Sequence, residues 1–254
     1  MYDFPVNHRV LQGLFDLELP NSPALWAVLK GNYSGKALVD DAQHPTQCVL
    51  RTDAALSYFS RQTSQAFLDE AVNRFRKVGP VWLIWPHGTK LQPPEIEFAR
   101  IVNRLEFYDY DPNSEVLAKL SGQLPQDCTI QRITCQLFDR CEWRDEMEFY
   151  AGSVSNFLEH GIGLCMMRED ETIVEAYASA LGKTRAEIGA ITREAYRGRG
   201  YAAIACAFLI KICDDLGFQA YWSCDADHQA SIRVAQKLGF RRERAYQIFE
   251  YHPE

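Results

Sequence analysis

The sequence predicts a mixed α/β protein, and two features of its C-terminal half carry that prediction. Three strand-like runs at 162–167, 172–181 and 186–192 are separated only by turn-like tetrapeptides, which indicates an antiparallel meander. A basic loop with two glycines follows, and then an apolar helical run at 201–216 and another strand-like run at 218–224. We therefore expect a mixed sheet with flanking helices in this half of the chain.

The first 125 residues alternate short helix and strand signals. They comprise expected helices at 10–15 and 24–29 and expected strands at 36–39, 47–51 and 55–59. The clearest helix is expected from Thr63 to Val78, where apolar residues recur on one face and Gly79-Pro80 provides a stop. A buried strand at 81–85 should follow it. These signals predict a smaller N-terminal α/β domain.

A boundary between two domains is predicted at 108–125, a segment rich in Asp, Asn, Ser, Gly and Pro. It divides the chain into an N-terminal domain, 1–125, and a C-terminal domain, 126–254. The second domain should begin with a strand at 129–138 and an amphipathic helix at 146–160.

Composition limits the class of function. The chain has 254 residues, 47% of them hydrophobic and 24% charged, as in an ordinary globular protein. Its net charge of -7 argues against a general nucleic-acid binder and mildly favours cationic, amine-bearing substrates. No apolar run reaches the roughly 20 residues that span a bilayer, and the start lacks a secretion signal. We expect a cytoplasmic protein that binds neither membrane nor nucleic acid; its oligomeric state stays open.

No metal site is expected. The eight cysteines form no C-x-x-C pair, and the six histidines include no H-E-x-x-H. Several cysteines lie inside apolar runs, where small buried thiols are the ordinary explanation.

The loop between 192 and 201 has the composition of an anion site. Amides at a helix start lack partners within the helix and carry the positive end of the helix dipole. Gly198 and Gly200 would let a pyrophosphate approach the backbone, and Arg193, Arg197 and Arg199 add positive charge.

Two other interpretations of this loop stay open. One is a plain surface turn. The other is a dinucleotide fingerprint, Gly198-x-Gly200-x-x-Ala203 with Asp225 further on, which would make the chain an NAD-binding oxidoreductase. However, five residues separate Thr192 from the first glycine, and too little chain follows for a doubly wound sheet.

A third interpretation rests on two linked motifs. Arg197-Gly-Arg-Gly-Tyr-Ala202 matches Arg-x-x-Gly-x-Gly/Ala, and Lys237-Leu-Gly-Phe240 follows the next predicted strand and helix. In both motifs the chain resembles the GNAT superfamily of acetyl-CoA-dependent N-acetyltransferases. Residues 160–165, 187–192 and 221–232 narrow the resemblance to the branch that includes the zwittermicin-resistance acetyltransferases. That branch suggests a polyamine-like or antibiotic acceptor.

The resemblance implies a reaction and a cofactor site. It implies direct transfer of acetyl from acetyl-CoA to the amine of a small molecule. The pantetheine arm would lie beside Ala190, Ile191 and Thr192. The pyrophosphate would meet the six loop residues Arg197, Gly198, Arg199, Gly200, Tyr201 and Ala202. His228 falls where the family often has an asparagine that contacts the cofactor, and Ser231 follows on the same helical face.

The catalytic groups are harder to assign. Glu187 is the first candidate base, although an exposed carboxylate at a strand start explains it equally; Glu175 is a weaker candidate. Family members often carry a tyrosine acid at the position of Ala235, so the general acid is unassigned. This departure keeps open a catalytically silent acyl-CoA-binding module.

Three further features have alternatives that the sequence leaves open. The helix and strand at 63–85 echo the C-terminal pattern without its loop, so the first domain is either a degenerate acetyltransferase-like unit or an unrelated acceptor-shaping domain. Tyr221 and Trp222 either line the acceptor pocket or pack in the core. Arg241, Arg242 and Arg244 either meet the 3'-phosphate of the cofactor or form a solvated basic turn, and the turn is the expectation at 241–244.

Overall fold

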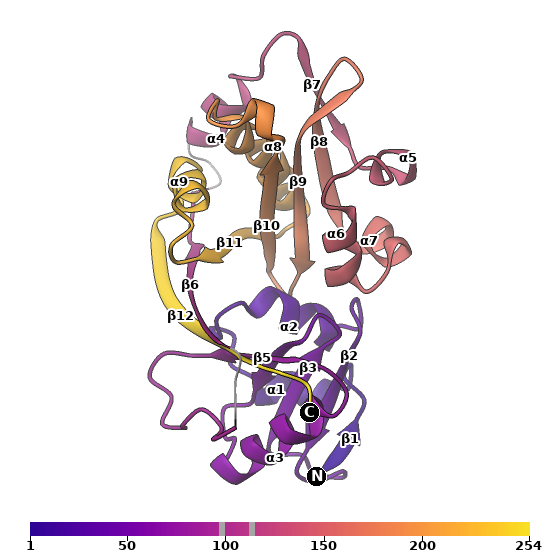
Figure 1. Cartoon of the computed structure of the whole chain (residues 1–254), viewed down its shortest axis with the longest axis vertical. Helices are drawn as coiled ribbons and strands as arrows, with labels where there is room; N and C mark the ends of the chain where they lie inside the picture. The colour runs from indigo at the N-terminus through magenta and orange to yellow at the C-terminus, as the bar shows by residue number, and fades with distance from the viewer. Residues whose placement is uncertain (97–99, 112–114) are drawn as a thin grey trace. The chain divides into compact units, whose positions relative to one another are not determined.

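The computed structural model describes residues 1–96, 100–111 and 115–254 (Figure 1). It confirms a mixed α/β fold, with a twelve-stranded mixed sheet whose strand order is β1-β2-β3-β4-β5-β12-β6-β11-β10-β9-β8-β7. The chain packs into two compact units. Unit 1 comprises residues 1–104 and 245–254, and unit 2 comprises residues 105–244.

The described residues of unit 1 form five strands, three helices and parts of two strands that continue into unit 2. The elements are β1 (Tyr2–Phe4), α1 (Arg9–Leu14), α2 (Ser22–Leu29), β2 (Gly35–Val39), β3 (Cys48–Thr52), β4 (Leu56–Phe59), α3 (Gln65–Arg76), β5 (Val81–Trp85), the start of β6 (Arg100–Tyr108) and the end of β12 (Arg242–Tyr251).

The expected elements of unit 1 form where the sequence places them. The hydroxyl of Ser64 accepts a hydrogen bond from the amide of Phe67 and so starts α3, whose apolar face packs toward the sheet. Strands β1 to β4 are antiparallel neighbours, whereas β4 and β5 are parallel. Helix α3 is therefore the crossover of a β-α-β unit.

Unit 2 contains the meander and the basic loop. Its elements are the end of β6, α4 (Glu115–Ser121), β7 (Cys128–Arg132), α5 (Cys135–Phe138), α6 (Arg144–Ala151), α7 (Val154–His160), β8 (Ile162–Arg168), β9 (Glu171–Leu181), β10 (Arg185–Thr192), a 3₁₀ turn (Glu194–Tyr196), α8 (Tyr201–Asp215), β11 (Gln219–Asp225), α9 (Gln229–Lys237) and the start of β12.

The predicted meander is confirmed. Strands β7, β8, β9 and β10 pair antiparallel in sequence order, and β10 then pairs parallel with β11. Side chains alternate across this sheet, so Ala176, Ile188 and Trp222 join a core cluster with Ile204 and Leu209 of α8. Figure 1 shows α8 running along the strands and α5, α6 and α7 gathered beside β8.

Two element predictions were wrong in the same way. The strand expected at 129–138 ends at Arg132, because the hydroxyl of Thr134 accepts from the Leu137 amide and starts α5. The helix expected at 146–160 is two helices, because Gly152 adopts a left-handed φ of 81° and Ser153 caps α7. In both places the apolar residues continue at regular spacing, but a capping residue starts a new helix.

Two regions expected to be irregular contain regular elements. Helix α4 lies inside the segment predicted as a boundary, of which residues 112–114 lie outside the described residues. The expected basic turn at 241–244 was also wrong. Arg242 begins strand β12 and pairs with Asp109 at 3.2 Å, and Arg241 pairs with Asp111 at 3.0 Å.

The compact units divide the chain at 104/105 and 244/245. The domain division at 125/126 stays a prediction about separate roles of the two halves. Within the described part of the chain, no helix combines the length and apolarity needed to cross a membrane.

Candidate functional site

The loop between β10 and α8 is built around two left-handed glycines. Gly198 has φ 77° and Gly200 has φ 82°, and a Cβ on either would meet no atom within 4 Å. The glycines are therefore required by backbone conformation, not by crowding within the protein. Gly200 is also the N-cap residue of α8, where it offers no side chain to bond the helix start.

Five successive backbone amides of this loop, those of residues 198–202, donate no hydrogen bond within the described chain. These amides open a fifteen-residue helix, so the positive end of its dipole lies behind them. Arg197 donates to the carbonyl of Thr192 at 3.1 Å and Arg199 donates to that of Ala195 at 3.3 Å, which fixes the loop on both sides. An anion fits this helix start.

Strands β10 and β11 separate beside that loop. They pair only at residues 185–187 of β10, and beyond a bulge between Glu187 and Ile188 the pairing of β10 continues with β9 alone. Figure 1 shows β11 diverging from β10. Between Ile188 and Thr192, therefore, one edge of β10 faces no strand among the described residues. This open edge leads toward the loop amides, and it contains Ala190, Ile191 and Thr192.

The residues proposed from α9 have different surroundings. His228 is the exposed N-cap residue of α9 and makes no side-chain cap bond. Ser231 instead accepts a hydrogen bond of 2.9 Å from the Trp222 indole, which packs in the core. Ala235 is fully buried, so its position supplies no polar group.

The two candidate bases differ in burial. Glu187 is the last residue of β10 that pairs with β11, and its side chain is half-buried. Glu175 is only 1% exposed, and its two oxygens accept from the amides of Glu142 and Trp143 at 2.6 and 2.9 Å. Burial raises the pKa of Glu175, although these hydrogen bonds oppose the rise. The structure thus gives Glu175 the work of tethering the start of α6.

A second polar group on the same face of β9 was not predicted. Tyr177 follows Glu175 at the strand period, is buried, and donates a hydrogen bond of 3.2 Å to Glu146 of α6. Its ring meets that of Trp143 edge-on, with centroids 5.5 Å apart. The period of two along β9 could have placed Tyr177 beside Glu175, but no sequence signal joins either residue to α6.

Tyr221 belongs to a buried polar cluster. Its hydroxyl donates to Glu106, which is 0% exposed and also pairs with Arg244. Tyr221 lies opposite Glu187 in the parallel register. Trp222 points to the other face, into the core. Tyr221 is 0% exposed and Trp222 4%, so both side chains are buried, and a role for either in an acceptor pocket stays a prediction.

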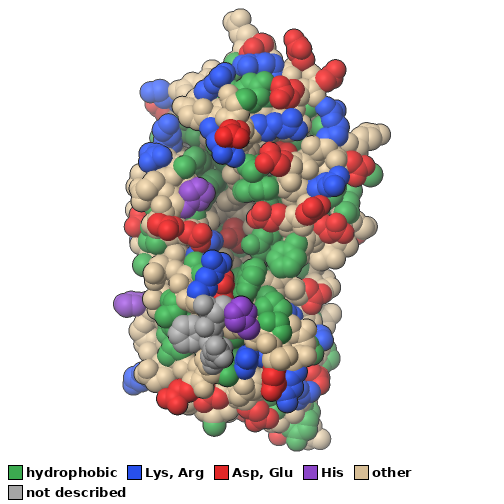
Figure 2. Space-filling view, in the orientation of Figure 1, with side chains coloured by type: hydrophobic (Ala, Val, Ile, Leu, Met, Phe, Trp, Pro, Cys, Tyr) green, Lys and Arg blue, Asp and Glu red, His purple; other side chains and the backbone are tan. Residues whose placement is uncertain are grey.

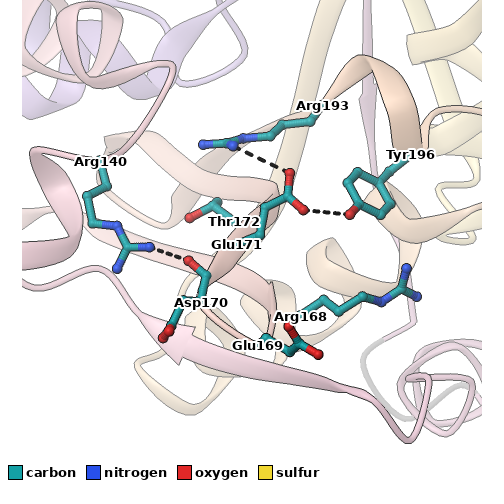
Figure 3. A pocket seen from close by; sticks show the side chains of 8 residues that line it. All are labelled: Arg140, Arg168, Glu169, Asp170, Glu171, Thr172, Arg193 and Tyr196. Carbon is teal, nitrogen blue, oxygen red and sulfur yellow. Dashed lines mark hydrogen bonds and ion pairs between the residues drawn. The ribbon is translucent and has the colours of Figure 1, made fainter.

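A surface pocket of about 520 Å³ adjoins the loop on the side of the β8–β9 turn (Figure 3). Its lining residues are Arg140, Arg168, Glu169, Asp170, Glu171, Thr172, Arg193 and Tyr196. The Tyr196 hydroxyl donates to Glu171 at 2.6 Å, and the guanidinium groups of Arg168 and Arg199 lie 5.4 and 5.5 Å from its ring centre. These contacts hold the loop against the turn.

Charge elsewhere forms no field of one sign on the face shown in Figure 2, where basic and acidic side chains are interspersed. Among the described residues, no three His, Cys, Asp or Glu side chains gather as a possible metal site. The absence of a metal stays a prediction. The antiparallel pairing of β8, β9 and β10 also differs from the parallel sheet that the dinucleotide alternative requires.

Comparison with known proteins adds a family match. A model of the family described as GNAT acetyltransferase matches residues 14–249. A Bacillus subtilis (strain 168) protein, the uncharacterized N-acetyltransferase YdfB, is 31% identical over 144 residues. That alignment covers 56% of this chain and 54% of YdfB, so it spans about half of each protein.

Two solved structures share the fold over nearly the whole chain. A GCN5-related N-acetyltransferase-like protein from Streptococcus suis 89/1591 has a TM-score of 0.69 and 24% identity, covering 97% of this chain and 98% of its own. A tandem GNAT protein from the clavulanic acid biosynthesis pathway has a TM-score of 0.62 and 9% identity, covering 98% of this chain and 93% of its own. At these identities the likeness concerns the fold alone.

Proposed function

This chain belongs to the GNAT acetyltransferase family, and we propose that it transfers an acetyl group from acetyl-CoA directly to the amine of a small molecule. The observation that carries the proposal is the junction of five unpaired amides at 198–202 with the open edge of β10. Family membership implies an acyl-CoA donor, and these two features suit its pyrophosphate and its amide-bearing arm.

The residues of the loop and of β10 suit acetyl-CoA. An uncapped helix start with two left-handed glycines offers amides where a pyrophosphate needs donors. Backbone groups of Ala190, Ile191 and Thr192 would pair with the pantetheine arm, and Arg197 and Arg199 hold the loop in shape. Bound acetyl-CoA supplies the thioester whose acetyl group is transferred.

Glu187 is the residue we assign to take a proton from the acceptor amine. An ammonium group must lose a proton before it can attack a carbonyl, and a positioned carboxylate can accept that proton directly or through water. Glu187 lies at the last position where β10 pairs with β11, so it is next to the point where the unpaired edge of β10 begins. Glu175 is withdrawn from this role because two backbone amides occupy its oxygens.

No residue is assigned as the general acid. The position that often carries tyrosine is Ala235, buried in the core. A thiol with a reference pKa of about 8.5 can leave as thiolate, so the reaction does not require that tyrosine. Backbone N–H groups of β10 would stabilise the developing oxyanion.

The finer assignments rest on the resemblance. We propose that the acceptor is polyamine-like or an antibiotic, as in the branch that includes the zwittermicin-resistance enzymes. We also propose that unit 1 is a degenerate acetyltransferase-like unit. Its β4-α3-β5 arrangement and the tandem GNAT structure with a similar fold support this idea. The cytoplasmic location and the absence of nucleic-acid and membrane partners remain expectations from composition.

The test is the thermal midpoint with acetyl-CoA, desulfo-CoA or NAD added separately. A ligand at a hundred times its Kd should stabilise the folded state by about 2.7 kcal/mol. We expect both CoA compounds to raise the midpoint and amines to release thiol from acetyl-CoA. Binding of CoA without thiol release from any amine would favour the catalytically silent acyl-CoA-binding module. A rise with NAD alone would revive the oxidoreductase.

A further inference from the structure

Gly189 leaves a gap in the face of the meander that is covered by α6. A Cβ placed on this residue would lie 3.6 Å from the ring of Trp143 and 3.6 Å from the ring of Tyr177. Gly189 and Trp143 are both half-buried, whereas Tyr177 is only 2% exposed. The two rings thus leave a methyl-sized space over Gly189, two residues beyond Glu187.

The hydroxyl of Tyr177 links that space to a carboxylate. The Tyr177 ring carbon nearest its hydroxyl is 3.9 Å from the Gly189 Cβ position, and the hydroxyl itself donates to Glu146 at 3.2 Å. Glu146 is half-buried, and burial raises its pKa while the Tyr177 hydrogen bond opposes the rise. Within the described chain, no lysine or arginine pairs with Glu146.

These neighbours suit a cation. Aromatic faces attract ammonium groups, and a partly desolvated carboxylate gains most from a charge-assisted hydrogen bond. Two strand residues span about 7 Å, so a site at Gly189 is separate from the proton acceptor assigned at Glu187. One ammonium of a short diamine could reach each carboxylate.

We propose that Glu146, oriented by Tyr177, binds a second ammonium group of the acceptor and selects diamines over monoamines. The proposal rests on the proposed acetyl transfer for the identity of the first amine. Binding of the diamine, however, requires no turnover.

The experiment compares 1,4-diaminobutane, 1-aminobutane and 4-aminobutan-1-ol, each titrated calorimetrically in the presence of desulfo-CoA. We expect wild type to bind the diamine roughly tenfold to a hundredfold more tightly than either monoamine, the range of a charged hydrogen bond. Glu146→Gln should remove that preference and leave monoamine binding unchanged. Tyr177→Phe should remove part of it, because it releases the Glu146 carboxylate.

Glu148→Gln is the matched control, since it removes an exposed carboxylate two residues along the same helix. It should retain the full preference for the diamine. Equal binding of all three amines by wild type would overturn the proposal, as would a Glu146→Gln variant that keeps the preference. Thiol release from acetyl-CoA is measured in parallel: a diamine preference that depends on Glu146 but comes without thiol release would support this binding site and reject the acetyl transfer.

Discussion

The two units contain the same β-α-β arrangement, but the helix of unit 2 begins without a capping side chain, whereas the helix of unit 1 begins with one. In unit 2, Gly200 precedes α8 in a left-handed conformation and the first amides have no acceptor. In unit 1, Ser64 precedes α3, its hydroxyl accepts from the Phe67 amide, and its own amide donates to Gln47 at 2.7 Å. Protein groups therefore already fill the place that an anion would take in unit 1.

The space beyond the paired strands differs as well. In unit 1 the last pairing of β4 with β5 is Ser57 opposite Leu83, and the buried Ser57 donates its hydroxyl to the carbonyl of Ala55. Further along, Phe59 and Trp85 meet with ring centroids 5.4 Å apart. The corresponding last pairing in unit 2 is Glu187 opposite Tyr221. The comparison teaches that one architecture can carry or lack a site, and that a few residues at the helix start and strand ends decide which.

The largest expected effect tests the helix start. Gly200→Glu should abolish the rise in thermal midpoint with acetyl-CoA, because it places a carboxylate at the proposed site of the pyrophosphate. Gly217→Glu is the control: Gly217 has the same φ of 82° and an equally open surrounding at the other end of α8. Both variants should lose about 1–2 kcal/mol to strain, but only the first should lose the response to acetyl-CoA. If both variants lose the response to acetyl-CoA equally, the loop is not the site.

The next effect tests Glu187, the carboxylate at the position that Ser57 holds in unit 1. Glu187→Gln should lower kcat by about 10²- to 10⁴-fold and leave the KM for acetyl-CoA nearly unchanged, because it removes a proton acceptor and no donor contact. Glu175→Gln should instead lower the stability by about 1–3 kcal/mol, and with it the thermal midpoint, since the amides of Glu142 and Trp143 lose a charged acceptor. Steady-state kinetics and melting curves separate the two. An unchanged kcat in Glu187→Gln would remove Glu187 from catalysis.

A smaller effect tests the filled helix start in unit 1. Ser64→Ala should cost about 1 kcal/mol of stability, because α3 loses its capping hydroxyl. Ser64→Gly should cost only a few tenths. Neither should change the response to acetyl-CoA in a melting experiment. If Ser64→Ala weakens that response, the donor binds in unit 1 and the comparison fails.

The smallest effect contrasts one acid in each unit. Partial burial works against ionisation of Asp40, but hydrogen bonds from Thr46 and Gln47 outweigh it and lower the pKa to about 2. Its contribution to stability is therefore present above about pH 4 and is lost as pH falls toward 2. Burial raises the pKa of Asp214 in unit 2 to about 6, so its relative contribution is present below about pH 4 and is lost as pH rises through 6.

Melting curves between pH 3 and 7 should show this contrast. Asp40→Asn should be less stable than wild type, and this difference in stability should shrink at low pH. The stability of Asp214→Asn relative to wild type should increase as pH rises. Each difference should reach about 1 kcal/mol, since solvent screens both groups. Parallel pH profiles for the two variants would contradict these assignments.

Much of the fold follows from local chemistry in the sequence. The meander, α3, α8 and the loop glycines were predicted because alternation, helical period and glycine conformation act over a few residues. The breaks at Thr134 and at Gly152-Ser153 were missed, although both are local capping signals, because an apolar period was followed across them. Strand β6 was missed because its pairing partners, β11 and β12, lie far away in the sequence.

The sequence by itself determined the family and the place of the two-glycine loop, since both depend on residues 197–202 and their order between a strand and a helix. Only the tertiary structure decided that Glu175 is occupied by amides 32 and 33 residues away. It also joined Tyr177 to Glu146, and Glu106 to Arg244 across 138 residues. The physical reason is range: a helix start is defined by neighbours along the chain, whereas a buried carboxylate takes its role from whichever distant groups the packing brings to it.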